Sequence, residues 1–316
     1  MSEKRLVPSP STQFPGSFAP NLREDSRKSA KSRALRSILY NYFTDGWNDI
    51  SVWKSAFIEF VGTTSLVYLS AMIHTTIGSF NTLQAAPYVG ITNIFLISLF
   101  IWAMAPSTGG HTNPLITFST MVTGLTGFCR GTLYLIGQTA GAALGGGLIR
   151  GSYGRNLTQL YQGGGCFFEP ELIDQGQVYL IESVMSFILL FIAFGVGLDP
   201  RQAQVMGPKL GPFLVGSALG LTTFATVGIA AGYGGANMNP ARCFSYAVAR
   251  QDFKCKLFSL EFPEWKHKLI RNGNVDQWVW WIGPLTGSLF HATVYHIAPP
   301  WHRAETLGRA HASNHA

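Results

Sequence analysis

The sequence contains little charge: only 12% of its 316 residues are Asp, Glu, Lys or Arg. An average soluble domain contains about 25% charged residues, so this composition argues against a soluble globular fold. Cysteine is scarce too, and the four cysteines form no CxxC or other spacing typical of a metal site. The sequence also has no grouping of a nucleophile, a base and an orienting residue. We therefore expect no enzyme activity, no metal site and no cofactor.

Apolar residues are abundant instead. They make up 47% of the sequence, which also contains 35 glycines, and glycine is more frequent in membrane-spanning helices than in soluble ones. Six apolar runs are long enough to cross the roughly 30 Å hydrocarbon core of a bilayer. They lie near residues 52–74, 87–105, 131–149, 178–198, 210–231 and 277–298. This pattern predicts an all-α membrane protein with six transmembrane helices, which has the lipid bilayer as a partner.

Polar and basic residues gather at the two ends of the chain. Residues 1–48 are rich in Ser, Pro, Lys and Arg and predict a disordered basic tail, and residues 299–316 predict a second tail. The net charge of +7 would suit a nucleic-acid-binding protein if the chain were soluble. Because most Lys and Arg lie in tails and loops, we expect them beside lipid headgroups and expect no nucleic acid partner.

Two Asn-Pro dipeptides interrupt the apolar sequence, one between the second and third runs and one between the fifth and sixth. An Asn followed by Pro suits a helix start, since the Asn caps the free N–H groups and Pro occupies the first helical position. Non-helical backbone at membrane depth is tolerated only inside protein or along a watery cavity. Each dipeptide therefore predicts a re-entrant half-helix beside a pore. The two motifs read Asn113-Pro114-Leu115 and Asn239-Pro240-Ala241.

The two halves of the chain repeat each other. Glu59 in the first run is matched by Glu182 in the fourth, each with a hydroxyl residue four positions later. Three spans in each half place the second half upside down, so we expect an inverted repeat over about 49–150 and 177–298. A carboxylate inside a membrane is costly and functional by default. We expect both carboxylates to accept hydrogen bonds from backbone N–H groups of the neighbouring Asn-Pro loop, rather than to relay protons.

These motifs resemble those of the aquaporins, or major intrinsic proteins. Besides the two Asn-Pro motifs, the resemblance includes Glu59-Phe60-x-Gly62-Thr63, Gly109-Gly110-His111, Gly137-Gln138-x-x-Gly141, Arg242 and Trp281-x-Gly283-Pro284-x-x-Gly287. It covers roughly residues 50–298. Two residues depart from the usual pattern, Leu115 where the family has Ala and Cys243 where it has Ser or Asp. With Cys166 after a glycine run, Cys243 makes the chain most similar to the X intrinsic proteins of fungi and plants.

The resemblance implies a fold and a topology. It implies six helices and two half-helices around one pore per subunit, four identical subunits, and a plasma membrane location with both termini cytoplasmic. Residues 49–298 would then form the channel domain, between cytoplasmic tails at 1–48 and 299–316. Charge alone does not decide this orientation, because the segment 250–275, which the resemblance places outside, is basic as well. Asn156 begins a glycosylation sequon on the outer side, and chance occurrence explains it equally well.

The resemblance also implies how the pore works. The half-helix N-termini direct partial positive charge at the pore centre and repel cations, including hydronium. Asn113 and Asn239 would each cap a half-helix with the carbonyl oxygen and donate an N–H to the passing solute. Arg242 would be the fixed cation at the narrowest point, and His111 would support the half-loop near the inner mouth. Such a pore passes neutral solutes and excludes ions and protons.

Counting from the two motifs maps the rest of the selectivity filter. It consists of Asn93, Val227, Ala236 and Arg242, and water-selective relatives usually place Phe and His at the first two positions. The substitutions predict a wider, mixed-polarity opening for water and for glycerol, urea, hydrogen peroxide or boric acid. A strict water channel stays open as an alternative, because Trp280, Trp281 and Ala247 resemble the water-channel pattern. A gradient-coupled transporter is a further alternative, in which Glu59 and Glu182 would be the titrating groups.

Three local features carry separate expectations. Leu115 adds volume where the family has Ala, so we expect a displaced Asn113 or a compensating small neighbour. Cys243 is most simply a buried free thiol, and a disulfide with Cys166 that pins the third loop over the mouth is the alternative hypothesis. The charged loop 199–209 is most simply solvated, although a gate there stays open as an alternative.

Overall fold

The computed structural model describes residues 37, 40–251 and 277–298. The chain divides into two compact units, Met1–Thr44 and Asp45–Ala316. The described part of the first unit is a short helical segment, in which the Thr44 hydroxyl donates to the Tyr40 carbonyl oxygen at 2.8 Å. Most of the predicted tail 1–48, and all of the predicted tail 299–316, lies outside the described residues.

Within its described residues, the second unit, which we call the helical unit, contains six long helices and two short ones. The six long helices are α2, α3, α5, α6, α7 and α9, and the short ones are α4 and α8. The only β-type pairing among the described residues is an isolated bridge. The helices span Ile50–Ser79 (α2), Ala85–Thr108 (α3), Pro114–Val122 (α4), Phe128–Leu160 (α5), Gln175–Ala193 (α6), Ala203–Phe224 (α7), Pro240–Arg250 (α8) and Val279–Ile297 (α9).

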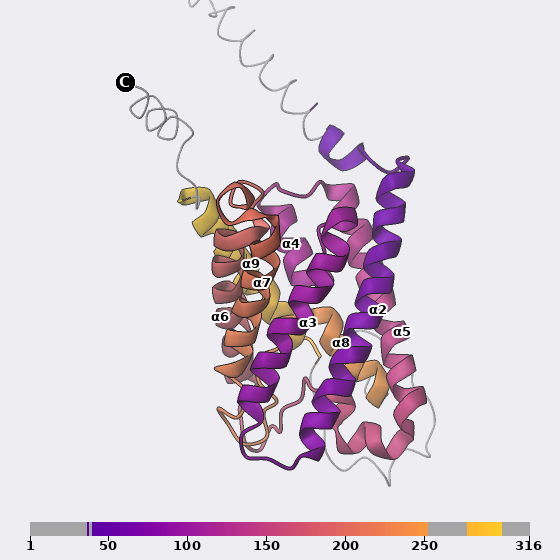
Figure 1. Cartoon of the computed structure of the whole chain (residues 1–316), viewed down its shortest axis with the longest axis vertical. Coiled ribbons are helices and arrows are strands. Elements are labelled where there is room, and N and C mark those ends of the chain that lie inside the picture. The colour runs from indigo at the N-terminus through magenta and orange to yellow at the C-terminus, as the bar shows by residue number, and fades with distance from the viewer. Residues whose placement is uncertain (1–36, 38–39, 252–276, 299–316) are drawn as a thin grey trace, which may run out of the picture. The chain divides into compact units, whose positions relative to one another are not determined.

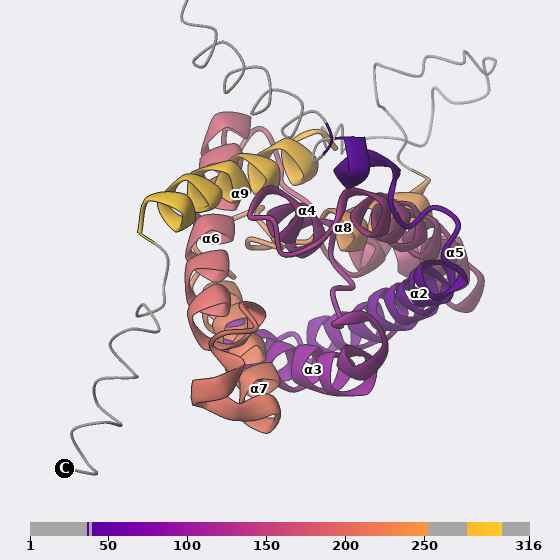
Figure 2. The ribbon, with the colours of Figure 1, turned by 90° about the horizontal axis from the view of Figure 1, so that it is seen from above.

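The long helices form a ring in which α4 and α8 lie (Figure 2). The tightest helix pairs are α2 with α5, α6 with α9, and α3 with α7. The first two pairs are equivalent in the two halves, and the third joins the halves. The half-helices start near one another and run in opposite directions, α4 into the upper part of Figure 1 and α8 into the lower part. We call the two ends of the helical unit the α4 end and the α8 end accordingly.

Two equivalent glycines let the paired helices approach closely. A Cβ added at Gly141 of α5 would lie 2.4 Å from the Phe60 carbonyl oxygen of α2. One added at Gly287 of α9 would lie 2.3 Å from the Ser183 carbonyl oxygen of α6. Phe60 and Ser183 directly follow the two membrane carboxylates, so these contacts hold both carboxylates at the same depth in their respective halves.

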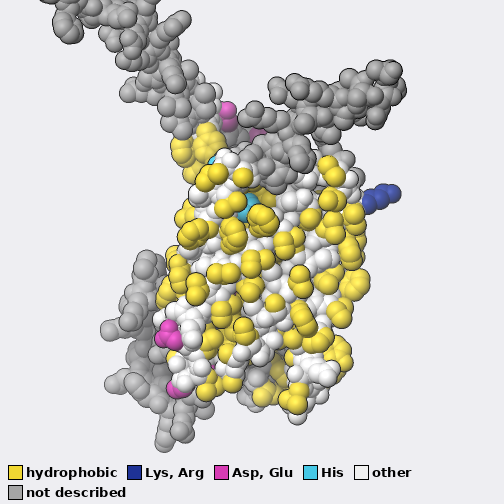
Figure 3. Space-filling view, turned by 90° about the vertical axis from the view of Figure 1, so that its left-hand side faces the viewer, with side chains coloured by type: hydrophobic (Ala, Val, Ile, Leu, Met, Phe, Trp, Pro, Cys, Tyr) yellow, Lys and Arg dark blue, Asp and Glu magenta, His cyan; other side chains and the backbone are white. Residues whose placement is uncertain are grey.

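The outer surface of the helical unit is apolar. Large side chains such as Phe57, Phe95 and Leu180 are more than half exposed, and on the face in Figure 3 hydrophobic side chains cover the middle while charged ones lie towards the ends. Helices α2, α3 and the combined segment Gln175–Leu198 are each long and apolar enough to cross a membrane. An exposed apolar area of this extent suits a lipid environment.

The predicted spans agree with the helices except at their ends. The third run, predicted at 131–149, continues as α5 to Leu160, with a kink at Gly154 (φ 67°, ψ −174°). The fourth run ends in a π-helix, Phe194–Leu198. For the fifth run, predicted at 210–231, the predicted end is wrong. Helix α7 stops at Phe224, and the chain then turns through Gly228 at φ 80°. The residues in and after this turn are still mostly hydrophobic, so the apolar pattern does not reveal where the helix ends.

Candidate pore

Both half-helices begin at the asparagines that the sequence indicates. Asn113 accepts a hydrogen bond from the Leu115 backbone N–H on its side-chain Oδ1 at 2.9 Å. Asn239 accepts one from the Arg242 backbone N–H in the same way at 3.2 Å. A proline follows each asparagine at the first helical position, where its missing N–H costs nothing.

The same two asparagines are joined across the middle of the helical unit. Asn113 Nδ2 donates to the Met238 carbonyl oxygen at 2.9 Å, and Asn239 Nδ2 donates to the Thr112 carbonyl oxygen at 3.2 Å. Thr112 and Met238 have positive φ angles of 44° and 55°, which turn their carbonyl groups towards the opposite loop. A side-chain amide has two N–H donors, so each asparagine has a second N–H beyond this cross-connection.

Glu59 organises the loop before α4. It is fully buried and accepts hydrogen bonds from the backbone N–H groups of His111 at 3.0 Å and Thr112 at 2.7 Å. The Thr108 hydroxyl and the Gln138 side-chain amide donate to the same carboxylate at 2.6 and 2.8 Å. These are the backbone contacts that the sequence predicts for Glu59. Four donors around one carboxylate favour a structural role over proton relay.

Glu182 has the equivalent place in the second half. It is fully buried as well and accepts from the backbone N–H groups of Asn237 at 2.7 Å and Met238 at 3.0 Å. The inverted repeat therefore extends to individual hydrogen bonds: in each half, a membrane carboxylate binds two successive N–H groups just before the Asn-Pro dipeptide.

Leu115 fits into the core without breaking these contacts. Its side chain is fully buried in a cluster with Leu189, Leu190 and Met238, and the small residues Ala218 and Ala236 belong to the same cluster. Asn113 keeps both its cap and its cross-connection. The cluster that holds Leu115 thus contains small residues as well as large ones.

Arg242 lies buried beside Asn93, as the spacing predicts. Its Nη1 donates to Asn93 Oδ1 at 3.2 Å and to Ser70 Oγ at 3.4 Å, and its Nε donates to Asn237 Oδ1 at 2.7 Å. Sequence reasoning missed Asn237 and Ser70. Asn237 lies two positions before the second Asn-Pro dipeptide, a signal that could have identified it, whereas Ser70 lies far away in the sequence and carries no local signal.

Val227 and Ala236 lie together on the segment between α7 and α8. A Cβ at Gly235 would lie 2.7 Å from Val227 Cγ2, and the Ala236 backbone N–H donates to the Thr226 hydroxyl at 2.9 Å. Val227 follows α7 in a turn and is half-buried. The structure thus pairs Val227 with the segment of Ala236, and Asn93 with Arg242.

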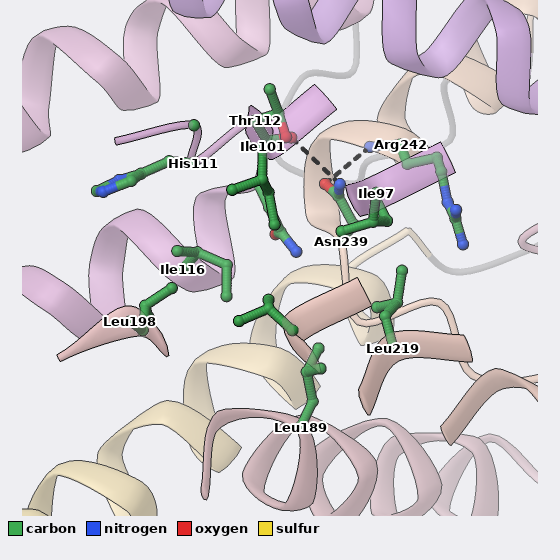
Figure 4. Close-up of a pocket in the computed structure, with 13 residues that line it drawn as sticks. Ile97, Ile101, His111, Thr112, Ile116, Leu189, Leu198, Leu219, Asn239 and Arg242 are labelled. Carbon is green, nitrogen blue, oxygen red and sulfur yellow. Dashed lines mark hydrogen bonds between the residues drawn. The ribbon is translucent and has the colours of Figure 1, made fainter. Parts of the chain in front are cut away.

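A narrow cavity runs along the loop before α4 and reaches the start of α8 (Figure 4). Its volume is about 30 Å³, and one water needs roughly 10–15 Å³ on this measure. It reaches from Leu198 and His111 past Asn239 to Arg242, and Asn93, Val227 and Ala236 are not in its lining. Six lining residues supply polar side chains or backbone groups: Gly110, His111, Thr112, Asn113, Asn239 and Arg242. The remaining lining residues are apolar: Ile97, Ile101, Ile116, Leu189, Leu198, Val215 and Leu219.

His111 lies in this lining with its ring fixed. Its Nδ1 is 3.1 Å from the Thr117 hydroxyl, and its ring meets the Tyr134 ring edge-on with centroids 5.3 Å apart. The expected supporting role of His111 matches this arrangement.

At the α8 end, a disulfide joins a loop segment to α8. Cys166 and Cys243 are bonded to each other, with Cα atoms 5.3 Å apart, so the favoured interpretation of Cys243 as a free thiol differs from the structure. Three successive glycines at positive φ, Gly163 to Gly165, turn the chain so that Cys166 reaches α8. We call residues 162–169 the strap. Cys129 is buried and free, and Cys255 lies outside the described residues.

The glycosylation sequon lies on the last part of α5, after its kink. Asn156 is exposed there, whereas the Thr158 hydroxyl is buried and donates to the Gly154 carbonyl oxygen at 2.6 Å.

At the α4 end, the prediction that the charged loop 199–209 is solvated is wrong for Asp199, whose side chain is fully buried. It accepts hydrogen bonds from Arg201 Nε at 2.8 Å and Arg201 Nη2 at 2.7 Å, and from the Tyr295 hydroxyl at 2.8 Å. Burial raises the pKa of Asp199, but these hydrogen bonds outweigh burial and hold the pKa below its ordinary value. The cluster fastens the end of the π-helix, whose Leu198 lines the cavity, to α9.

The helices and the two facing half-helices define a multi-pass membrane channel built as an inverted repeat. Residues 46–295 match the family model described as "Major intrinsic protein". The chain is 28% identical to the "Aquaporin PIP-type" of Atriplex canescens over 78% of this chain and 80% of that protein. It is 26% identical to "Aquaporin TIP1-1" of Zea mays over 80% of this chain and 90% of that protein.

Among solved structures, the aquaglyceroporin from Plasmodium falciparum is similar, with a TM-score of 0.60 and 19% identity. The match covers 78% of this chain and 98% of that one, and at this identity it shows the fold alone. The chain belongs to the major intrinsic protein family. It is an aquaporin-type channel and an integral membrane protein, not an enzyme.

Proposed function

We propose that the chain is a passive channel for small neutral solutes, which conducts water together with glycerol, urea, hydrogen peroxide or boric acid and excludes ions and protons. The observation that carries the proposal is the contact between Asn93 and Arg242, with Asn93 Oδ1 accepting from Arg242 Nη1 at 3.2 Å. At this position an amide replaces the aromatic ring that water-selective relatives usually have. An amide is smaller than a phenyl ring and offers hydrogen bonds to a solute hydroxyl.

The filter of this channel consists of Asn93, Val227, Ala236 and Arg242. Two facts support the grouping: Asn93 contacts Arg242 directly, and Val227 packs on the segment of Ala236. Val227 supplies an apolar wall for the carbon atoms of a solute, and Arg242 supplies fixed N–H donors. The buried positive charge of Arg242 opposes cations, as do the N-termini of α4 and α8.

A strict water channel is the second candidate, and the narrowness of the cavity favours it. About 30 Å³ accommodates roughly two water positions, so a larger solute requires side chains to move. The proton- or sodium-coupled transporter is disfavoured, because four hydrogen bonds to Glu59 and two to Glu182 hold these carboxylates in place.

The proposal extends to assembly and location. We infer a homotetramer in the plasma membrane with both termini in the cytoplasm, which places the α4 end inside and the α8 end with its disulfide outside. The disulfide supports this orientation, since disulfides persist in oxidising compartments. Similarity to the X intrinsic proteins rests on Cys166 and Cys243, the pair that forms this bond.

The test uses purified protein in liposomes, with stopped-flow light scattering for water and for each solute. We expect water and glycerol to enter faster than in protein-free vesicles, without saturation and at a rate independent of an imposed proton or sodium gradient. Fast water flux without uptake of any of the four other solutes would establish the strict water channel. Uptake that saturates and follows a gradient would establish a transporter.

A further inference from the structure

A short chain of hydrogen bonds connects Arg242 to the strap. Arg242 Nη1 donates to Ser70 Oγ on α2 at 3.4 Å, and the Tyr246 hydroxyl on α8 donates to the same oxygen at 3.0 Å. All three side chains are at most 1% exposed. Ser70 therefore receives two donors, one from the filter arginine and one from a tyrosine that does not line the cavity.

Tyr246 is in turn held by the strap. A Cβ at Gly163 would lie 2.9 Å from the Tyr246 carbonyl oxygen, and one at Gly164 would lie 3.2 Å from Tyr246 Cε1. The glycine run thus packs directly on the tyrosine, at a distance that no other residue type permits without displacement. The strap therefore lies against both the backbone and the ring of Tyr246, whose hydroxyl donates to Ser70.

The strap itself is fastened at two places on α8. The disulfide joins Cys166 to Cys243, the residue that follows Arg242. Arg250, at the other end of the half-helix, donates from Nη1 to the Gly165 carbonyl oxygen at 2.9 Å and from Nη2 to the Cys166 carbonyl oxygen at 3.2 Å. One face of α8 therefore carries Tyr246, both fastening points and the filter arginine.

We propose that Ser70 and Tyr246 are positioning residues for Arg242, and that the disulfide-bonded strap keeps them in place and so sets the solute selectivity of the channel. The proposal rests on the proposed role of Arg242 in the filter. Without the Ser70 acceptor, the guanidinium keeps the contacts of Nη1 with Asn93 and of Nε with Asn237, and the Nη1 end moves more freely than in the wild type. A more mobile arginine leaves a wider opening part of the time, which benefits a solute of glycerol size more than water.

The experiment compares Ser70→Ala and Tyr246→Phe with matched controls. Ser65→Ala removes an exposed hydroxyl on the same helix, which bonds only to its own helix at Val61. Tyr153→Phe removes a hydroxyl that donates to the Ala71 carbonyl oxygen at 3.2 Å. We expect the glycerol-to-water permeability ratio to rise roughly two- to tenfold in Ser70→Ala and Tyr246→Phe, the range that one net hydrogen bond represents. The controls should match the wild type, and dithiothreitol should raise the wild-type ratio as well.

A second readout separates this proposal from the proposed function. Phenylglyoxal modifies arginine, and peptide mapping of the purified protein measures the rate at Arg242 without any transport. We expect faster modification in Ser70→Ala, in Tyr246→Phe and in the reduced wild type than in the controls. If both the modification rate and the permeability ratio equal those of the controls, Ser70 and Tyr246 do not position Arg242. The proposed function is tested separately, by the flux of water and glycerol through the wild-type protein alone.

Discussion

Asn113 and Asn239 each donate a hydrogen bond to the peptide group that precedes the other. Asn113 Nδ2 binds the carbonyl oxygen of Met238, and Asn239 Nδ2 binds that of Thr112. The two half-helices are thereby joined at their N-termini by a reciprocal pair of contacts. This relationship fixes the centre of the pore, because each asparagine is held at its cap and at its cross-connection.

The reciprocal pair predicts the effect of Asn113→Asp. The variant replaces an N–H donor by a carboxylate oxygen that faces the Met238 carbonyl, so the cross-connection is lost and two acceptors oppose each other. We expect the free energy of unfolding to fall by about 1–3 kcal/mol and cation exclusion to weaken. Thermal unfolding in detergent and vesicle conductance measure the two effects. Asn156→Asp, at an exposed position, is the matched control and should change neither.

The two membrane carboxylates should differ in their sensitivity to substitution. Glu59→Gln turns an amide N–H towards groups that are themselves donors, and four donors surround Glu59 whereas two surround Glu182. Hydrogen bonds to a charged group contribute about 1.5–3 kcal/mol each. We therefore expect Glu59→Gln to lower the unfolding temperature more than Glu182→Gln does. Glu169→Gln, at an exposed position, serves as the control. Equal losses for Glu59→Gln and Glu182→Gln would refute the structural account of the difference.

Acid should loosen the α4 end through Asp199. Folding lowers the pKa of Asp199 below its ordinary value of 3.8, because the hydrogen bonds from Arg201 and Tyr295 outweigh burial. The unfolded chain therefore binds the proton more tightly, so this contribution to stability is present above the ordinary pKa and is lost as pH falls through the lowered one. We expect Asp199→Asn to be less stable at neutral pH and to lose less stability on acidification. Unfolding curves from neutral pH to about 3 provide the measurement, and parallel pH profiles would contradict the role of Asp199.

Breaking the disulfide should destabilise the channel. The bond joins residues separated by 77 positions, and closing a loop of that length lowers the entropy of the unfolded state by an amount equivalent to about 4.5 kcal/mol in the loop-entropy model. We expect Cys243→Ser and treatment with dithiothreitol to lower the unfolding temperature similarly. The control Cys129→Ser, which leaves the disulfide intact, should not lower it in this way. Mass mapping without reductant should find the Cys166–Cys243 peptide pair. Two free thiols in that experiment would exclude the bond.

The fold could be predicted from the sequence because its signals are local. Apolar runs mark the spans, and the capping chemistry of Asn113 and Asn239 marks the half-helices. The end of α7 was mispredicted because the residues after Phe224 stay apolar while the backbone turns at Gly228. Hydrophobicity reports the surroundings of a residue and carries no information about such a turn.

The site was predictable only where spacing from a motif fixes a position. Asn93 lies next to Arg242 as counted. Ser70 acts through a tertiary contact with no sequence signal, and the burial of Asp199 depends on Tyr295 from a distant helix. The disulfide also depends on a tertiary contact, because the separation of two cysteines in the sequence does not give the distance between them in space.

Solute uptake by the double variant Asn93→Phe with Val227→His shows whether the filter of this channel admits solutes larger than water. We expect wild-type vesicles to take up both water and glycerol, and the variant to keep its water permeability but lose glycerol uptake. A control variant, Ile91→Phe with Ile229→His, introduces the same two side chains at exposed positions and should behave like the wild type. Glycerol uptake that is equal in the wild type and the double variant, or absent from both while water passes, would show that Asn93 and Val227 do not open the filter to larger solutes.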